Sequence, residues 1–412
     1  MQQQHLAAYE TGHRGFEPLP ERALAAFLRR IGPLETGRLS IHCPSGRRFV
    51  LQGTDGSETP NAAVRVVDWR CLPRLMFGGQ LGFAEGHLRG EWDSPDLHEV
   101  FALVLANGAG FQARFGGSRL SRVASRLIHR LNANSRRGSR RNIAYHYDLG
   151  NDFYAAWLDP TMTYSSALFT AGDEDLQTAQ ARKYRAIAEA ADLQQGQSVL
   201  EIGCGWGGFA EMAARDYGSR VLGVTLSREQ LSYARARLAD AGLQHGTEMQ
   251  FRDYRDLDGT FDRVVSIEMF EAVGAENWSR YFDVVRERLR PGGIAALQVI
   301  SVADERFETY RRSTDFIQRY IFPGGMLPSP SAFRTAAGAA GLEVEREQFF
   351  GQSYAETLKI WREDFDRAWP RLREQGFDER FKRMWNYYLS CCEASFRAGT
   401  IDVGIYRLRR PA

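Results

Sequence analysis

Hydrophobic positions along the first part of the chain follow short, changing periods. A helical spacing over residues 21–31 is followed by alternating segments that are typical of strands. After a glycine-rich run over 77–90, a continuous apolar helix is expected over 96–106. The strand-like segments cover residues 37–43, 47–52 and 63–67. This pattern predicts a small α+β domain over residues 1–110.

From residue 143 to residue 412, strand-like apolar runs alternate with helical stretches, which predicts an α/β fold with a Rossmann-like, doubly wound parallel sheet. Pro291-Gly-Gly293 is expected to break the chain before the fifth strand. The tail over 401–409 is expected to form a final edge strand, and the aromatic-rich, helical region over 307–396 to cover the open end of the sheet. The strands are predicted at 198–203, 220–226, 248–251, 261–268 and 294–301, with helices at 228–241 and 277–289.

A basic segment lies between these two parts. No acidic residue occurs between Glu99 and Asp148, whereas nine arginines fall between Arg114 and Arg141. The segment therefore carries a charge of +9. Because the whole chain carries a net charge of +2, the rest of the chain carries −7. Within 111–142, apolar residues recur every three or four positions with arginines between them, which predicts an amphipathic linker helix. It either packs on the body with solvated arginines or lies on anionic lipid headgroups.

Length and composition bound the class of protein. With 412 residues, 43% of them hydrophobic and 25% charged, two domains of ordinary globular composition are expected. The longest apolar run, over 100–106, is too short to span a membrane, and the first residues show no secretory signal. Five cysteines and eight histidines show neither disulfide nor ligand spacing. We therefore expect reduced thiols, a cytoplasmic location and no metal site.

The strand over 198–203 leads directly into a glycine loop. Glycine lets backbone amides approach a ligand closely, and a strand followed by a glycine turn and a helix binds nucleotide-like cofactors. The spacing here is E-x-G-x-G-x-G, not the G-x-G-x-x-G of dinucleotide sites. It resembles motif I of the S-adenosylmethionine (SAM) methyltransferases, although a purely structural turn is the alternative. We predict a SAM site that includes Glu201, Gly203, Cys204, Gly205 and Gly207.

Two further strand ends are expected to complete this site. Where an acid usually holds the ribose hydroxyls, the chain has Thr225, so Gln230 in the next helix is expected to supply hydrogen bonds. After the third strand, Tyr254 and Arg255 follow Asp253 at the position where methyltransferases hold the adenine. Taken alone, the residues at either of these strand ends could also form a turn with no role in binding.

Several motifs together resemble the cyclopropane-fatty-acid synthase family of SAM-dependent methyltransferases, and the resemblance extends from about residue 19 to residue 409. It implies a SAM-binding α/β domain behind a small N-terminal domain, with activity on unsaturated acyl chains of membrane phospholipids. It also implies SAM contacts from Tyr147, Tyr164 and Ser165. The motifs are YHYDLGNDFY (145–154), LDPTMTYSS (158–166), GCGWGG (203–208), MFE (269–271), YIFPGG (320–325) and FKRM (381–384).

The implied reaction explains the residue types. A carbon–carbon double bond is a weak nucleophile, so only an activated methyl, such as the sulfonium methyl of SAM, reacts with it. Attack leaves a carbocation on the acyl chain, which an apolar, aromatic-walled channel protects from water until a base removes a proton. In the family a bound bicarbonate ion is thought to be that base. The resemblance places its holders at Ser166, Glu271, Gln298, Tyr354 and Cys392.

The chain departs from the family pattern at three positions. Ser166 stands in place of Cys, Gln298 in place of His, and Ala272 in place of the His after Glu271. Ser and Gln can still donate hydrogen bonds to an anion. Loss of a proton from the transferred methyl closes a cyclopropane, which is the product we expect. Loss of a proton elsewhere gives a methylene or methyl-branched chain, and the altered positions lie where this choice is made.

Other interpretations remain open. Glu268 and Glu271 at a strand end are also explained as helix caps, and Cys392 as a core residue. A lipid- or nucleic-acid-binding protein that retains SAM as a structural relic would bind SAM without turnover, and an RNA methyltransferase would need a recognisable RNA module. As partners we expect unsaturated phospholipid chains and an anionic membrane surface, and no nucleic acid. We expect a peripheral location on the inner face of the membrane. A homodimer is left open.

Overall fold

The computed structural model describes residues 18–108, 149–170 and 174–412. The predicted basic helix over 111–142 lies outside these residues. The chain divides into two compact units. Of the described residues, the first contains 18–108, 313–317 and 373–398, and the second contains 149–170, 174–312, 318–372 and 399–412.

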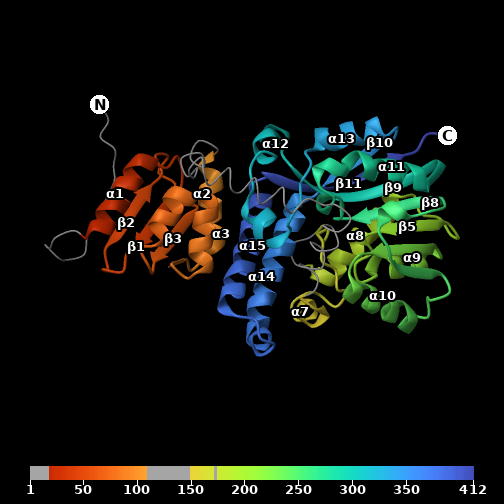
Figure 1. Cartoon of the computed structure of the whole chain (residues 1–412), viewed down its shortest axis with the longest axis horizontal. Helices are drawn as coiled ribbons and strands as arrows, with labels where there is room; N and C mark the ends of the chain where they lie inside the picture. The colour runs from red at the N-terminus through yellow and green to blue at the C-terminus, as the bar shows by residue number, and fades with distance from the viewer. Residues whose placement is uncertain (1–17, 109–148, 171–173) are drawn as a thin grey trace. The chain divides into compact units, whose positions relative to one another are not determined.

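The first unit is built on a four-stranded sheet with the order β2-β1-β3-β4 (Figure 1). Strand β1 is antiparallel to β2 and parallel to β3. Its strands are β1 (Arg38–His42), β2 (Arg48–Gln52), β3 (Asn61–Val66) and β4 (Trp92–Asp93). Its helices are α1 (Leu19–Ile31), α2 (Cys71–Leu88), α3 (Leu97–Ala106) and α15 (Glu379–Arg397).

The periodic pattern of the sequence explains most of this unit. Leu24, Leu28 and Ile31 recur at helical spacing in α1 and are buried in the core of the unit. The glycine-rich run over 77–90 forms most of α2, which is interrupted at Gly79, where φ is 60° and ψ is −140°. The predicted strands and the apolar helix are confirmed to within two residues at each end.

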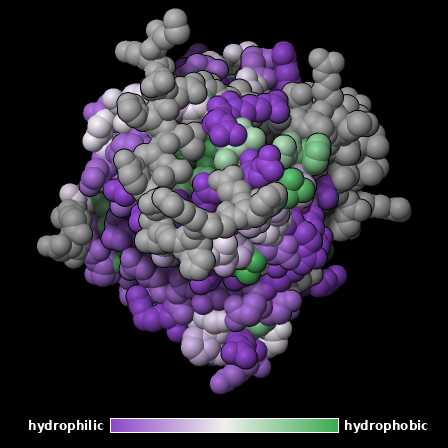
Figure 2. Space-filling model, turned by 90° about the vertical axis from the view of Figure 1, so that its left-hand side faces the viewer, coloured by the Kyte–Doolittle hydropathy of each residue, from purple (hydrophilic) through white to green (hydrophobic). Residues whose placement is uncertain are grey.

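The surface of the described residues includes polar and large hydrophobic side chains. Figure 2 shows one face of the molecule; among its coloured residues hydrophilic ones predominate, and hydrophobic ones come to the surface in several small areas. No helix among the described residues combines the length and the apolar character needed to cross a membrane. The large hydrophobic side chains that are exposed are Leu19, Val67, Met76, Phe77 and Phe349.

The second unit contains a seven-stranded sheet with the order β10-β11-β9-β8-β5-β6-β7. Its strands are β5 (Ser198–Ile202), β6 (Arg220–Thr225), β7 (Thr247–Phe251), β8 (Phe261–Ile267), β9 (Leu289–Val302), β10 (Glu343–Phe349) and β11 (Ile401–Arg409). The strands from β9 to β7 pair in parallel, whereas β11 is antiparallel to both of its neighbours.

Helices cover both faces of this sheet. The helices of the second unit are α7 (Asn151–Ala155), α8 (Leu176–Ala190), α9 (Gly208–Tyr217), α10 (Arg228–Asp240), α11 (Trp278–Arg288), α12 (Asp304–Tyr310), α13 (Pro330–Ala339) and α14 (Gly351–Glu374). Figure 1 shows α11 and α13 on one face, with α8, α9 and α10 on the other. The predicted Rossmann-like, doubly wound fold is confirmed.

Strand β11 corrects the prediction of a final edge strand. It lies between β9 and β10, with Ile405 opposite Gln298. The edge belongs to β10, whose sequence EVEREQF is largely exposed. Charged residues are typical of edge strands because they discourage pairing with other chains, and they also hide the strand pattern in the sequence.

Two expectations about the C-terminal half are wrong. Strand β9 begins at Leu289 and continues through Pro291-Gly-Gly293, where a break is predicted. The region over 307–396 is not a single helical cover, because it includes the strand β10 and because contacts group residues 373–398 with the first unit.

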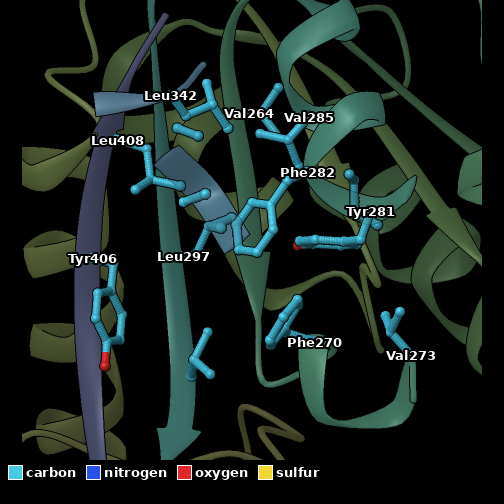
Figure 3. Close-up of a cluster of buried hydrophobic side chains, with 14 of the residues drawn as sticks. Val264, Phe270, Val273, Tyr281, Phe282, Val285, Leu297, Leu342, Tyr406 and Leu408 are labelled. Atoms are coloured by element: carbon cyan, nitrogen blue, oxygen red, sulfur yellow. The ribbon is translucent and has the colours of Figure 1, made fainter. Parts of the chain in front are cut away.

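The apolar core beside the sheet fixes the end of β8. Figure 3 shows Tyr281 and Phe282 of α11 beside Phe270 and Leu297. The ring centroids of Phe270 and Phe282 are 5.2 Å apart, and Phe270 is 1% exposed. Because Phe270 is buried, the short 3-10 turn η2 (Phe270–Ala272) that carries Glu271 is held at the carboxyl end of β8.

Candidate active site

The glycine loop follows β5 directly, as predicted. The amides of Gly203 and Cys204 both donate to the carbonyl of Val224 in β6, at 2.9 and 3.0 Å, which anchors the loop to the neighbouring strand. Gly205 has a φ of 52°, and a Cβ built on it meets no atom within 4 Å. At Gly207 a Cβ would lie 3.1 Å from the Cβ of Ala234. Gly205 is therefore open toward a ligand, whereas Gly207 allows the loop to pack against α10.

A cavity lies at the carboxyl ends of β5, β6 and β8, where ligands bind in doubly wound sheets. Gly207 does not line it, and Tyr147 lies outside the described residues. The cavity wall includes the other predicted SAM-binding residues: Tyr164, Ser165, Glu201, Gly203, Cys204, Gly205, Thr225, Gln230, Tyr254 and Arg255.

The predicted ribose contacts lie at the start of α10. Ser227 caps this helix, and its hydroxyl accepts a hydrogen bond from the amide of Gln230 at 3.2 Å. The Thr225 hydroxyl donates to Oε1 of Gln230 at 3.0 Å. The cap and this hydrogen bond together fix the Gln230 side chain at the wall of the cavity.

The predicted adenine contacts are held by an ion pair. The Arg255 guanidinium donates through Nε and Nη2 to the two carboxylate oxygens of Asp253, at 2.8 and 2.7 Å. The Tyr254 ring lies edge-on to Tyr281, with 5.5 Å between centroids. The side chains that the sequence analysis assigns to the adenine are therefore pre-positioned by neighbours outside the cavity.

A buried lysine that the sequence analysis does not identify lies behind this site. Lys183 of α8 is 0% exposed, and its Nζ donates to the Ser165 hydroxyl at 2.6 Å. Burial lowers the pKa of Lys183 to about 7, against the nearby carboxyls of Glu268, Asp159 and Glu201. The sequence does contain a signal for this residue, because Lys183 lies on the buried, mainly apolar side of the amphipathic helix α8, where a charged residue is unusual.

A buried carboxyl, that of Glu201, lies near Lys183. It lies on β5 and is 2% exposed. Burial raises the pKa of Glu201 to about 8, although the positive charges of Lys183 and Arg237 oppose the shift. Among the described residues, no hydrogen-bond donor reaches its Oε2.

Three donors from distant segments converge on the carboxylate of Glu268, which also lines the cavity. The Ser166 amide and the Gln298 side-chain amide donate to Oε1 at 2.8 and 2.7 Å. The Tyr354 hydroxyl donates to Oε2 at 2.7 Å. Burial raises the pKa of Glu268, and these hydrogen bonds oppose the shift. Its φ of 50° is unusual for a residue other than glycine.

Glu271 lies close by but is held differently. One of its carboxylate oxygens accepts a hydrogen bond from the Ile300 amide, and the other has no donor within the described parts of the chain. Burial, followed by the charge of Glu268, raises the pKa of Glu271 to about 8. Glu271 does not line the cavity.

Aromatic rings connect the cavity wall to Tyr354. Tyr164, which lines the cavity, lies 5.1 Å from Trp361 and 5.3 Å from Tyr154 between ring centroids. Trp361 in turn lies edge-on to Tyr354 at 6.1 Å. Trp206 of the glycine loop extends the group, 5.0 Å from Tyr154. These rings form a packed aromatic cluster behind the cavity wall, and only Tyr164 and Trp206 of the cluster line the cavity.

The family model of mycolic acid cyclopropane synthetase matches residues 134–405. The chain belongs to this family. It is thus a SAM-dependent methyltransferase of the cyclopropane synthase family, as the resemblance implies.

Relatives at the level of whole chains agree with this assignment. The chain is 41% identical to a tuberculostearic acid methyltransferase of Mycobacterium tuberculosis, over 95% of this chain and 94% of the relative. It is 38% identical to the cyclopropane-fatty-acyl-phospholipid synthase of Escherichia coli, over 83% and 86%. A crystal structure of a mycolic acid cyclopropane synthase with SAH and CTAB has a TM-score of 0.62 and 33% identity, covering 66% of this chain and 98% of that one.

Against the family pattern, the predicted bicarbonate holders are only partly brought together. Ser166, Gln298 and Tyr354 meet, but around Glu268, and Ser166 does so through its backbone amide, since its hydroxyl donates to the Ala167 carbonyl at 2.8 Å. Cys392 lies on α15 in the first unit.

Because three donors from the predicted holders already bind the Glu268 carboxylate, they do not fit a separate anion. Glu268 is the central residue that the sequence analysis leaves without a catalytic role. A glutamate at a strand end has no distinctive sequence signal, and one of its donors is a backbone amide.

Proposed function

We propose that the protein adds one carbon from SAM to the double bond of an unsaturated fatty acyl chain of a phospholipid and closes a cyclopropane ring. The main support is the position of Glu268, a buried carboxylate on the wall of the cavity that contains the glycine loop. A hydrogen-bonded carboxylate on this wall would be suited to remove a proton beside the expected site of the methyl donor. The relative in Escherichia coli, named for this activity on phospholipids, supports the same substrate class.

The residues present fit SAM. When bound, SAM supplies an electrophilic sulfonium methyl. Gly205 leaves open space at the cavity wall, so the backbone there can approach the donor. Gln230 would hold the ribose hydroxyls and Tyr254 the adenine, since both line the cavity.

The aromatic group suits the cation that forms on the acyl chain. The rings of Tyr164 and Trp206 line the cavity, where they would shield a carbocation from water and attract it through their faces. Trp361 and Tyr354 pack behind Tyr164 and support it. An acyl chain is apolar, so the same surface favours its binding.

A second product is a methylene or methyl-branched chain, made from the same substrate and donor. It is favoured by the departures at Ser166, Gln298 and Ala272, which surround the deprotonation site in the sequence pattern of the family. The 41% identical relative is named as a methyltransferase rather than a cyclopropane synthase. A methyl-branched alkene forms when the cation loses a proton from a neighbouring chain carbon. A methylene group forms when a hydride first shifts from the methylated carbon to the cationic one, and a methyl proton is then lost.

We also propose that the protein works at the inner face of a membrane as a peripheral protein. Its substrate is part of a lipid bilayer, and the segment from Arg114 to Arg141 carries nine arginines and no acidic residue. Such a segment is attracted to anionic headgroups, at about 1 kcal/mol per basic residue near the surface.

The test uses the purified protein, SAM and vesicles with either unsaturated or fully saturated phospholipid chains. We expect S-adenosylhomocysteine to be released only with the unsaturated chains, and mass spectrometry to show acyl chains heavier by one methylene unit. Reaction of the product lipids with ozone separates the outcomes, because a cyclopropane resists it and an alkene is cleaved. Absence of any mass gain on unsaturated chains would exclude both products.

A further inference from the structure

We infer that the Glu268 side chain takes the place of a bound anion and is itself the base that removes the proton after methyl transfer. The inference rests on the proposed function and names a catalytic residue for it. It also replaces the bicarbonate ion that the family resemblance implies with a group that belongs to the chain.

The first argument is the set of donors. An anion-binding site needs several hydrogen-bond donors directed at one point in a buried space. Here the Ser166 amide, the Gln298 side chain and the Tyr354 hydroxyl supply three, all between 2.7 and 2.8 Å from a Glu268 oxygen. These donors come from residues that the sequence analysis assigns to bicarbonate. A second anion beside this carboxylate would be repelled by it.

The second argument is backbone strain. Glu268 adopts a φ of 50°, a left-handed backbone conformation that is strained for a residue with a side chain. A glycine would adopt this conformation freely. The strained backbone is held by the Glu268 amide, which donates to the Gln298 carbonyl at 2.8 Å. Strain of this kind persists where the surrounding contacts require it, and such positions cluster at functional sites.

The third argument is access. Glu268 and the adjacent Met269 line the cavity, as does Gly203 of the glycine loop. Glu271 does not line it, and one of its oxygens is bound to the Ile300 amide. Of these two buried glutamates, Glu268 is therefore the one that faces the space where donor and acyl chain would meet.

The chemistry balances without another reactant. The π electron pair of the alkene bonds to the methyl carbon as the carbon–sulfur bond breaks, with its electron pair remaining on sulfur. The Glu268 carboxylate then takes a proton from the transferred methyl, and the released electron pair closes the ring on the cationic carbon. Tyr354 and Gln298 hold the carboxylate in place during this step. The proton leaves to water after the product departs.

The experiment compares three proteins in carbonate-free buffer, with SAM and unsaturated phospholipid vesicles. The wild type is expected to keep its turnover when bicarbonate is removed and to change by less than about twofold when it is added. Glu268→Gln keeps the size of the side chain but cannot accept the proton, so turnover should fall by about 100-fold or more. Glu268→Gly leaves an empty space lined by the three donors, so added bicarbonate should restore part of its turnover.

A binding measurement supports the kinetics. Titration of ¹³C-labelled bicarbonate, followed by NMR, should show binding to Glu268→Gly and none to the wild type. Calorimetric titration with SAM checks that both variants retain the donor site and are folded. If the Gly variant does not fold, the Gln variant and the wild type still decide the question.

The outcomes separate the two levels of the argument. A wild type that loses turnover without bicarbonate and regains it on addition overturns the inference but leaves the proposed function intact. Full turnover of Glu268→Gln in carbonate-free buffer overturns it as well. Failure of the wild type to modify unsaturated lipids under any condition overturns the proposed function itself.

Discussion

At the scale of single residues, the site is defined by buried ionisable groups that lie close together. Four such groups lie in the interior of the second unit: Glu201, Glu268, Glu271 and Lys183. Burial raises the pKa of the three glutamates and lowers that of the lysine, which favours the neutral form of each. Such groups are costly to bury and are typical of active sites. Each retains contacts that limit the cost, as in the hydrogen bonds to Glu268.

The raised pKa of Glu271 makes stability depend on pH. The folded protein binds this proton up to about pH 8, whereas the unfolded chain releases it near the ordinary value of 4.5. Its stabilising contribution is therefore complete below the unfolded value and is lost as the pH rises through the folded value. Glu271→Gln cannot ionise, so its thermal midpoint should fall less than that of the wild type between about pH 5 and about pH 9.

Glu345→Gln is a control with the opposite sign. Hydrogen bonding to Arg409 lowers the pKa of Glu345, so its contribution is lost only in acid, below the window used. The midpoint of this variant should fall with rising pH as steeply as that of the wild type. Differential scanning fluorimetry measures the thermal midpoint at each pH. If the midpoints of the wild type and of Glu271→Gln fall equally with rising pH, the assignment to Glu271 is contradicted.

At the scale of elements, the cofactor site depends on three consecutive segments: the strand β5, the glycine loop and the helix α9. The strand pattern of the sequence predicts β5 to β8 to within two residues at each end. It misses β10, whose charges resemble those of a loop, and therefore places β11 at the edge. Strand order depends on which partners remain available after packing, and no local signal in the sequence reports it.

The glycine loop makes a prediction that separates ligand contact from backbone strain. Gly205→Val places a branched side chain at the open wall of the cavity, so SAM affinity should fall by more than about tenfold. The matched control is Gly242→Val, at a comparable φ of 71° with open space around it and outside the cavity. Both variants should lose about 1–2 kcal/mol of stability, since both carry a side chain in left-handed backbone. Calorimetry that finds equal SAM affinity in the two variants would refute the role of Gly205.

At the scale of the whole molecule, catalysis on a lipid requires both a donor site and a means of reaching the bilayer. The second unit contains the donor site, and no described helix crosses a membrane. The basic segment over 111–142 lies outside the described residues, so its role stays a prediction from the sequence.

Replacing Arg122, Arg126 and Arg130 with Gln should weaken binding to anionic vesicles on the order of a hundredfold, at about 1 kcal/mol per arginine, while SAM affinity stays unchanged. The control removes the same charge from three exposed arginines of α1 and should bind vesicles nearly as well as the wild type. The control substitutions are Arg22→Gln, Arg29→Gln and Arg30→Gln. Vesicle sedimentation that shows equal losses would attribute binding to net charge rather than to this segment.

The sequence by itself determined the α/β class, the parallel strands, the glycine loop and the family, because periodicity and backbone requirements are encoded within a few neighbouring residues. Only the tertiary structure decided which groups surround the reactive carboxylate. The donors to Glu268 lie 102, 30 and 86 positions away along the chain, and one is a main-chain amide that any residue could provide. Their meeting depends on strand order and helix packing, which no local pattern expresses.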